Sequence, residues 1–428
     1  MKKTINLASS IIIVYFVFGG LMYLAGASTN KKGALKIVSY PFSLTYESAR
    51  SLKGELLGLN EPILHDPENF FNFQSHGDFA EYFKDTIVLE YSVSSGFGEN
   101  STHYWYNSII TSEGIVNKQI LKLNGHTINS QNPFKFSWSQ DNDRTISTGR
   151  TRPKHSIFKE NDIIFNVKHG PLFNYSREGL LNWINSDYIF HHSQELDING
   201  NIWACGIIPP TQKADNYDQY GSIPFSIVLV DSETGKTIYA ESIDSIINRS
   251  PELDRKSKLI KLNRPENLDL WHLNDVEPHP FNDEIIALSL RNINAIVIYN
   301  YKTKKVLKTV SDQSLMQHDV DFINDSTIAV FSNNTNSIND YYNSINIIDL
   351  STGKCLDSLL FNEFEKNQIN TSHQGLFSIS DSLVMVEETQ SSKIWFFSTT
   401  SSSTLLEIKI KSGDLGHEFL NWSRVRQQ

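Results

Sequence analysis

The sequence predicts an all-β protein, and three observations lead to that prediction. From Asp85 onward, short segments rich in β-branched and aromatic residues alternate with polar turns, without a long helical periodicity. Aromatic residues make up 11% of the chain and charged residues only 20%, a composition that favours strands. Finally, related segments recur along the chain, and we count six of them. Radial repetition of small sheets is typical of a β-propeller, so we expect six blades.

The repeat is clearest in the second half of the chain. His192, His272, His318 and His373 each stand at the head of a segment, at separations of about 46 to 80 residues. A four-stranded blade takes about 40 to 50 residues, and the longest interval holds an additional loop at residues 209–221. The innermost strands of a propeller line a central channel, so these motifs would face one another. A β-sandwich is the alternative, but it does not account for one histidine motif per repeat.

The N-terminal segment predicts export from the cytoplasm. Lys2 and Lys3 precede an uncharged run over residues 7–27, which is long enough to span a bilayer. Ala25-Gly26-Ala27 would also suit cleavage of a signal peptide. We therefore predict a signal-anchor or transmembrane segment over residues 1–30, with cleaved secretion as the alternative. Either prediction places the propeller outside the cytoplasm, in the periplasm or the extracellular space.

The remaining chain divides into two parts. Residues 31–84 form an N-terminal extension of unclear structure, because they carry no regular pattern. Residues 85–428 carry the repeated segments and are the predicted propeller. With 428 residues, the chain is long enough to bury a large core.

Charge and cysteine content exclude several classes of function. The formal net charge of −10 argues against a nucleic-acid partner, and any anion site must be a local cationic pocket. Cys205 and Cys355 are the two cysteines, far apart in the chain. We expect two buried free thiols, although an exported protein could pair them. No cysteine and histidine spacing typical of a metal site is present, so we expect no metal.

Polar residues stand at strand edges within residues 269–334. His272 precedes one apolar strand, Arg291 follows the next strand, and His318 precedes a third. In a propeller these positions converge on one end of the central channel, and His192 would approach from a neighbouring sheet.

Several motifs in this region and just upstream of it resemble a known family. The motifs are residues 269–275 (DLWHLND), 289–292 (SLRN), 317–319 (QHD), 330–334 (VFSNN), and the pair His191-His192 followed by 197–203 (DINGNIW). In this order and spacing they resemble the bacterial arylsulfate sulfotransferases, which do not use the nucleotide donor PAPS. The resemblance covers residues 85–428.

The resemblance implies a six-bladed propeller with a sulfate site in its central channel. It also implies ping-pong transfer of a sulfuryl group from a small aryl sulfate donor to a phenolic or other hydroxyl acceptor, without a cofactor. The histidine of the Gln-His-Asp motif is the nucleophile in that family, which implies His318 here. His272, Arg291 and His192 correspond to its supporting catalytic residues.

Two further residues are predicted to bind substrate. Asn274 matches the family as a donor beside His272, and His373 would line the channel because it heads the sixth repeat. Sulfuryl transfer requires positively charged and hydrogen-bonding residues, because it depends on positioning of the reactants and on electrostatic stabilisation of the charged oxygens. A neutral imidazole is a good nucleophile near pH 7. The guanidinium fork of Arg291 suits sulfate oxygens.

Neighbouring polar residues are expected to have structural roles. Consecutive strand residues point to opposite faces, so Asp319 would brace the backbone or a neighbouring blade rather than the imidazole of His318. Asp275 and Glu277 would brace the strand entry, because carboxylates facing a sulfate would repel it. His191 is the expected structural partner of His192. His155 and His279 are expected to be ordinary histidines.

Two rival functions remain open at the level of the sequence. A metal-dependent hydrolase could use His192, His272 and His318 as ligands, but Arg291 would repel the cation and no closely spaced histidine pair typical of a zinc site exists. The second rival is a non-catalytic, membrane-anchored propeller that acts as a binding or assembly module. The combined motifs favour the sulfotransferase, and the non-catalytic module is the alternative.

Overall fold

A computed structural model describes twelve segments of the chain. It divides into two units, residues 1–64 and 65–428, and every described residue belongs to the second unit. The described segments are residues 71–76, 79–83, 86–96, 98–134, 137–140, 144–147, 151–209, 223–263, 269–334, 342–380, 382–410 and 418–427. The predicted anchor over residues 1–30 lies outside them.

Among the described residues, five antiparallel sheets of four or more strands build the second unit, and we number them I to V. Sheet I contains β26 (Glu418–Gln427), β2 (Ile87–Ser95), β3 (Thr102–Thr111) and β4 (Gly114–Asn124). Sheet II contains β7 (Pro153–Lys159), β8 (Asp162–Val167), β9 (Gly170–Ser176), β10 (Leu181–Leu196), β11 (Ile202–Ile207), β12 (Phe225–Val230) and β13 (Thr237–Ser242). Sheet III contains β14 (Leu273–Pro278), β15 (Ile285–Leu290), β16 (Ala295–Asn300) and β17 (Lys305–Ser311).

The other two large sheets follow the same order. Sheet IV contains β18 (Val320–Asn324), β19 (Thr327–Ser332), β20 (Ser344–Asp349) and β21 (Lys354–Leu359). Sheet V contains β22 (Leu376–Ser380), β23 (Leu383–Glu388), β24 (Lys393–Ser398), β25 (Ser403–Ile410) and β1 (Phe71–Ser75). A hairpin of β5 (Ser137–Gln140) and β6 (Arg144–Ser147) stands apart.

Helices are few and short among the described residues. The α-helices are α3 (Phe79–Tyr82), α4 (Gly125–Gln131), α6 (Ile243–Ile247), α7 (Pro251–Asn263) and α8 (Phe361–Lys366). Three 3-10 turns, η2 (Gly98–Asn100), η4 (Arg291–Ile293) and η5 (Thr389–Ser391), follow or precede strands. No helix of the described segments is both long and apolar enough to cross a membrane.

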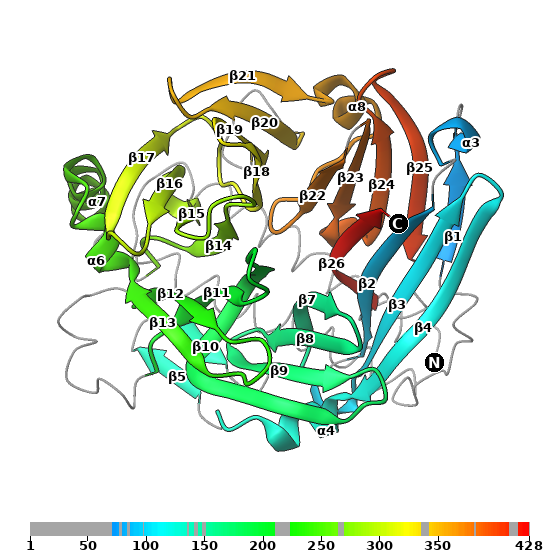
Figure 1. Cartoon of the computed structure of the whole chain (residues 1–428), viewed down its shortest axis with the longest axis horizontal. Coiled ribbons are helices and arrows are strands. Elements are labelled where there is room, and N and C mark those ends of the chain that lie inside the picture. Colours follow the sequence, from blue (N-terminus) through cyan, green and yellow to red (C-terminus); the bar gives the residue numbers. More distant parts are fainter. Residues whose placement is uncertain are drawn as a thin grey trace, which may run out of the picture. The chain divides into compact units, whose positions relative to one another are not determined.

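The sheets lie around a common centre, as a propeller predicts (Figure 1). The first strand of sheets III, IV and V lies toward the centre, and the fourth strand lies toward the rim (Figure 1). Sheet I closes the ring, because β26 from the C-terminal end pairs with β2 from the N-terminal part. Residues of the expected extension also contribute, since β1 pairs with β25 at the edge of sheet V. The all-β prediction and the propeller-like arrangement are thus confirmed.

The number of separate sheets differs from the six that the sequence predicts. Sheet II has seven strands because β10 is one continuous strand of 16 residues. Its first part pairs with β9 up to Asn185, its last part pairs with β11 from Ile189 onward, and Phe190 pairs with both strands, with register shifts in both pairings. Four sheets of four or five strands and one of seven therefore replace six separate blades.

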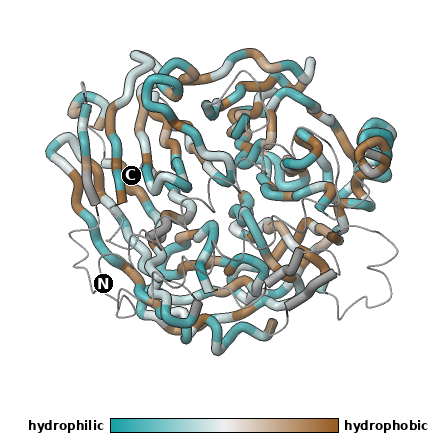
Figure 2. Tube along the Cα trace, turned by 180° about the vertical axis from the view of Figure 1, so that it is seen from behind, coloured by the Kyte–Doolittle hydropathy of each residue, from teal (hydrophilic) through white to brown (hydrophobic). Residues whose placement is uncertain are grey.

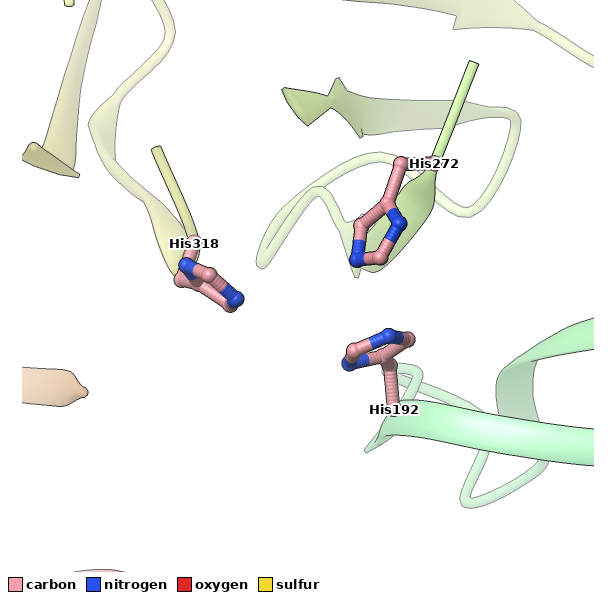
Figure 3. A group of neighbouring side chains, drawn as sticks. All are labelled: His192, His272 and His318. Atoms are coloured by element: carbon pink, nitrogen blue, oxygen red, sulfur yellow. The ribbon is translucent and has the colours of Figure 1, made fainter. Parts of the chain in front are cut away.

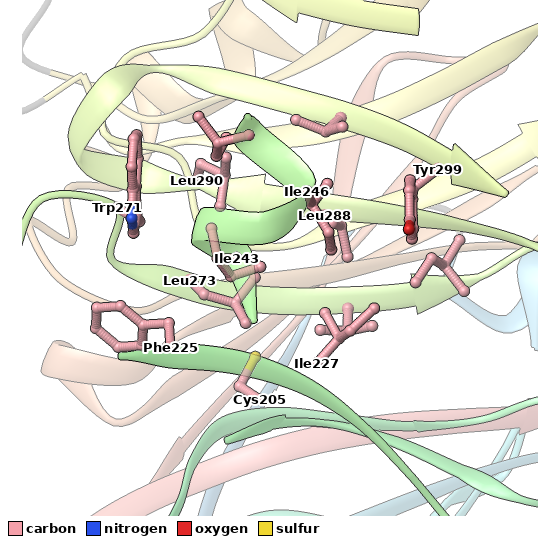
Figure 4. Close-up of a cluster of buried hydrophobic side chains, with 14 of the residues drawn as sticks. Cys205, Phe225, Ile227, Ile243, Ile246, Trp271, Leu273, Leu288, Leu290 and Tyr299 are labelled. Atoms are coloured by element: carbon pink, nitrogen blue, oxygen red, sulfur yellow. The ribbon is translucent and has the colours of Figure 1, made fainter. Parts of the chain in front are cut away.

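Hydrophobic faces pack between adjacent sheets. Figure 2 shows brown, hydrophobic stretches recurring along the strands around the ring, separated by teal turns. In the largest cluster, Ile227 of sheet II, Leu288 of sheet III and Ile243 of α6 meet with Trp271 in a dry interface (Figure 4). Sheet II also packs against itself, since Phe190 and Leu172 contact Val228 across a separate cluster. This packing is what fixes the sheets around the centre.

Hydrogen bonds also link each sheet to the next, close to the centre. The backbone N–H of Val276 donates to Ser193 Oγ at 3.1 Å, which joins sheet III to sheet II. Three more bonds of this kind join the following sheets: Val320 N–H to Asp275 Oδ2 at 2.8 Å, Phe377 N–H to Asp319 Oδ2 at 2.8 Å, and Ser423 N–H to Glu387 Oε2 at 2.6 Å. We call these bonds the inter-sheet latches. They confirm that Asp319 braces a neighbouring blade. Asp275, which was expected to brace the strand entry, accepts from the next sheet instead.

Arg424 completes the circuit between sheets I and II. Its guanidinium forms an ion pair with Glu195 at 2.5 Å and donates to the backbone oxygen of Ser156 at 2.9 Å. The latch residues lie beside the predicted site. The strands that hold the ring together are therefore also the strands that carry the site residues.

The cysteines are both free. Cys205 is buried, as expected, whereas the expectation of burial is wrong for Cys355, which is exposed. Cys355 lies on β21, the outer strand of sheet IV, where side chains face solvent.

Candidate functional site

Three of the predicted histidines converge near the centre of the ring. His192 comes from β10, while His272 and His318 immediately precede β14 and β18. One ring nitrogen from each lies within 4.8 Å of the others, and Figure 3 shows the three imidazoles facing a shared space. Residues up to 126 positions apart in the sequence thus meet because their sheets are neighbours in the ring.

Asn333 holds the ring of His318 in one orientation. The side-chain amide of Asn333 donates to the backbone oxygens of Thr371 and Gln374, both at 2.7 Å, so its oxygen must face His318. His318 Nδ1 lies 2.6 Å from this oxygen, which only accepts, so Nδ1 carries the proton. The N–H of Gln374 donates to His318 Nε2 at 3.2 Å. Nε2 therefore carries the lone pair of the ring, which accepts the Gln374 N–H.

The imidazoles of His318 and His192 are kept neutral. Burial lowers the pKa of His318 well below its usual value, and the positive charge of Arg291 lowers it further. Burial also lowers the pKa of His192 well below its usual value, with His272 adding to the effect. Since protonation is shifted to acidic pH, each ring retains a lone pair at neutral pH.

His272 is held by a carboxylate. Its Nδ1 lies 2.5 Å from Asp269 Oδ2, so Nε2 is the nitrogen that faces the other histidines. The backbone oxygen of Asp269 accepts from the side chain of Asn292 at 2.6 Å, which fixes this loop. His272 and His192 both adopt left-handed backbone conformations, with φ of 47° and 54°. Such conformations are costly for residues other than glycine and cluster at functional sites.

Arg291 supplies the positive charge beside this cluster. It lies in η4, directly after β15, and is only 7% exposed. Its Nη1 donates to Asn292 Oδ1 at 3.2 Å, while Nε is buried with no hydrogen-bond partner in the described segments. Burial lowers the pKa of Arg291, and Asp269 opposes that effect, but a guanidinium stays charged at neutral pH. A buried donor without a partner is a place for a ligand oxygen.

The two predicted substrate-binding residues occupy different surroundings. His373 is exposed, and its Nδ1 lies 2.6 Å from Ser372 Oγ. Burial of its ring and the charge of Arg291 lower the pKa of His373, which places it within electrostatic range of the cluster. Asn274 is buried, and its amide donates to the backbone oxygen of Gln317 at 2.8 Å. The structure thus brings His373 near Arg291, whereas the amide nitrogen of Asn274 binds the neighbouring sheet.

Three other histidines were expected to have structural or ordinary roles, and the structure agrees for two of them. His191 is buried beside His192, with ring centroids 5.1 Å apart, as a structural partner would be. His279 is buried away from the cluster, and its Nε2 lies 3.3 Å from Asp325 Oδ1. His155, in contrast, packs against Trp422 with the two rings tilted, and its ring centroid lies 6.3 Å from that of His192, next to the cluster.

Two contributors were not predicted from the sequence. Asn333 orients His318, and Asp269 orients His272. Both lie within motifs that carry the resemblance, at residues 330–334 and 269–275, so their position was a usable signal. The orientation of Asn333, however, depends on backbone oxygens of a loop that is distant in the sequence.

A second cavity of about 500 Å³ lies on the inner strands, and none of the three histidines lines it. Its charged lining includes Glu195, Glu277, Asp319, Asp321 and Arg424. Burial raises the pKa of Glu277, Asp319 and Asp321 well above their usual values, and repulsion between carboxylates adds to it. This cavity is therefore acidic, whereas the histidine cluster lies beside a buried arginine.

Comparison with known protein families shows to which family the chain belongs. The model of the arylsulfotransferase (ASST) family matches residues 160–409. This chain belongs to the arylsulfotransferase family. The matched region contains the three histidines, Arg291 and Asn333, so the resemblance predicted from the motifs is confirmed. Membership suggests a transferase that acts on small aryl sulfate substrates.

No curated protein matches this arylsulfotransferase-family chain. Among solved structures, the C-terminal WD40 domain of Sif2 is similar at 12% identity and a TM-score of 0.35, covering 76% of this chain and 70% of that one. Apo AztD from Citrobacter koseri has 11% identity, a TM-score of 0.35 and coverages of 80% and 98%. Kuenenia stuttgartiensis hydrazine synthase has 9% identity, a TM-score of 0.36 and coverages of 63% and 68%. We infer nothing from scores this low.

Proposed function

We propose that this chain transfers a sulfuryl group from an aryl sulfate to a phenolic or other hydroxyl acceptor, by a ping-pong mechanism through a sulfo-histidine at His318. One observation carries the proposal: the proton of His318 is held on Nδ1 by Asn333, which leaves a lone pair on Nε2. Family membership supports the same chemistry. No cofactor is required, because the nucleophile and the anion-binding groups are side chains.

In the first step, His318 Nε2 attacks the sulfur of the donor. The N–S bond forms as the bond from sulfur to the aryl oxygen breaks, and the aryl oxide leaves with the electron pair. The 3.2 Å hydrogen bond from Gln374 to Nε2 is given up as attack begins. The sulfated ring carries a positive charge with its proton still on Nδ1, and Asn333 Oδ1 stabilises that charge.

In the second step, the acceptor hydroxyl attacks the sulfur and the N–S bond breaks. The electron pair returns to Nε2, so His318 regains its neutral form, while the hydroxyl proton passes to a neutral neighbouring imidazole. His192 suits this role, because its lowered pKa keeps it neutral before the transfer.

The remaining predicted residues bind the sulfuryl oxygens and the substrates. Arg291 offers a buried guanidinium whose Nε has no partner in the described segments, so it would bind an equatorial oxygen. His272 would donate to a second oxygen or protonate the departing aryl oxide. His373 would contact the substrate at the exposed side of the cluster, and Asn274 would assist beside His272.

We also propose that sheet II serves as two blades, which gives six around the channel. The packing supports this proposal, since Leu172 and Val228 of the same sheet meet in a core cluster of their own. The N-terminal run over residues 7–27 supports a membrane anchor with the propeller outside the cytoplasm.

The transfer reaction itself is the test. Purified wild-type protein incubated with 4-nitrophenyl sulfate and phenol should release nitrophenol, and mass spectrometry of the protein without acceptor should find sulfate on His318. Replacement of the nucleophile (His318→Ala) should lower the rate at least about 10³-fold. Replacement of Arg291 (Arg291→Gln) removes one charge-stabilising group and should lower it about 10²–10³-fold.

His126 provides a matched control, because it is an exposed histidine remote from the cluster in sequence, with a side chain 75% exposed. The variant His126→Gln should retain wild-type activity. If several aryl sulfates give neither transfer nor modified His318 in folded wild-type protein, a non-catalytic binding module becomes the better account.

A further inference from the structure

We propose that His192, His272 and His318 also form a binding site for Zn²⁺, and that the bound ion reversibly inhibits the enzyme. The inhibition rests on the proposed function, while the binding stands on the geometry alone. The ion would act as a regulator and not as a cofactor of sulfuryl transfer.

The arrangement of nitrogens carries this inference. One nitrogen from each of the three rings lies within 4.8 Å of the other two. A tetrahedral Zn²⁺ with bonds of about 2.0–2.1 Å holds its nitrogen ligands about 3.3 Å apart. The rings come from three separate sheets and face one space in Figure 3, so small side-chain rotations close the remaining gap.

Partners behind the rings match those of metal-binding histidines. Such histidines usually donate their other N–H to a carboxylate or a carbonyl oxygen, which fixes the tautomer. Asp269 Oδ2 lies 2.5 Å from His272 Nδ1, and Asn333 Oδ1 lies 2.6 Å from His318 Nδ1. In both residues Nε2 is therefore the nitrogen that carries the lone pair, and at His318 metal binding displaces the hydrogen bond that Nε2 accepts from the Gln374 N–H at 3.2 Å.

His192 is available to complete the set. Neither of its ring nitrogens has a hydrogen-bond partner in the described segments, although its backbone oxygen accepts from Asn166 at 3.0 Å. Its ring centroid lies 4.9 Å from that of His272 and 6.2 Å from that of His318. Three histidines with an open fourth position are a recurrent zinc-binding arrangement.

The charges beside the three histidines limit the affinity of the site for Zn²⁺. The guanidinium of Arg291 is close enough to act on His318 and opposes a cation, whereas Asp269 beside His272 favours one. We therefore expect binding of roughly micromolar strength, weaker than a dedicated structural zinc site. The ion would take the same Nε2 lone pair of His318 that attacks sulfur, so zinc and transfer chemistry exclude each other.

Binding is measured without any sulfate ester. Protein treated with a chelator and then dialysed is titrated with ZnCl₂ by calorimetry, and Co²⁺ is added to a second sample to detect tetrahedral d–d absorption. We expect one ion per chain. The variants His192→Gln and His272→Gln should each weaken binding at least about tenfold, while His126→Gln should bind as wild type does.

Thermal unfolding of each variant confirms that it is folded. Absence of saturable binding by folded wild-type protein, or wild-type affinity in either folded histidine variant, would overturn the proposal. Inhibition is then tested with 4-nitrophenyl sulfate, and it should be reversed by the chelator. Transfer without zinc binding would overturn only this inference, whereas zinc binding without transfer in chelated protein would overturn only the proposed function.

Discussion

At the scale of single residues, Asn333 decides which nitrogen of His318 can react. Its amide is locked by the backbone oxygens of Thr371 and Gln374, and its oxygen therefore accepts the Nδ1 proton. Histidine alone would populate both tautomers, only one of which has its lone pair on Nε2. The tautomer of the nucleophile thus depends on the loop between α8 and β22.

The pH dependence of transfer should report this environment. Because burial and Arg291 lower the pKa of His318, the nucleophile becomes protonated only well below about pH 6.5. Wild-type activity should therefore change less than about twofold between pH 8 and pH 6. Replacing the amide by a carboxylate (Asn333→Asp) stabilises the imidazolium, raises the pKa of His318 and moves the acid limb to higher pH.

The measurement is kcat with 4-nitrophenyl sulfate across this pH range, with thermal unfolding to confirm that the variant is folded. His126→Gln serves again as the control and should reproduce the wild-type profile. A wild-type rate that falls with a midpoint near pH 6.5, or an unshifted limb in folded Asn333→Asp, contradicts the role assigned to Asn333.

The residues of the cluster were largely predictable, but their supports were not. His192, His272, His318 and Arg291 carry unusual polar side chains at strand edges, and repetition pointed to their common end of the ring. Asn333 acts only through backbone oxygens that lie about 40 residues further along the chain. No local pattern reveals such a contact, because it forms when two sheets pack side by side.

At the scale of elements, each inner strand is tied to the next by a latch. The Val320 N–H donates to Asp275 Oδ2, and the two residues belong to sheets III and IV. Burial, with Glu195 nearby, raises the pKa of Asp275 to about 7, and either form of the carboxyl group can accept the bond. Removing the acceptor leaves a buried backbone donor without a partner, which costs about 1–3 kcal/mol.

We therefore expect Asp275→Ala to lower the free energy of unfolding by about 1–3 kcal/mol, as measured by urea denaturation. Replacing the exposed acid Glu113 (Glu113→Ala) should change it by less than about 0.5 kcal/mol. Similar values for the two variants would mean that the latch contributes nothing to stability.

The merging of two predicted blades in sheet II also belongs to this scale. Periodicity marks where strands begin and turns occur, but it does not say where a long strand changes partners. In β10 the change lies between Asn185 and Phe190, where Phe190 pairs with both β9 and β11, and the chain runs through it without a turn. Six segments were therefore visible in the sequence, whereas the continuity of β10 was not.

At the scale of the whole molecule, the inner strands carry a histidine cluster and a separate acidic cavity. Burial and mutual repulsion raise the pKa of Glu277 and Asp321. Groups with a raised folded-state pKa stabilise the fold fully below their unfolded pKa, about 3.9 for Asp and 4.3 for Glu. This contribution is lost as pH rises through the higher folded-state pKa, so these carboxylates destabilise the ring in alkaline solution.

Replacing these carboxylates with neutral amides should remove the loss of stability at alkaline pH. Asp321→Asn and Glu277→Gln are expected to raise the melting temperature relative to wild type at pH 8, with a smaller gain at pH 5. Comparison at each pH removes the opposite effect of the buried histidines, whose lowered pKa values weaken the fold in acid. The exposed Glu113→Gln should show no such trend, and an equal gain at both pH values would contradict this account.

Closure by β26 sets an order of events during synthesis. The ring joins end to end only when residues 418–427 pair with β2, so a nascent chain whose residues 418–427 have not yet left the ribosome cannot close. All three histidines are translated before Arg424, which ties sheet I to sheet II. Until residues 418–427 emerge, a nascent chain therefore lacks both the pairing that completes sheet I and the ion pair that joins sheet I to sheet II.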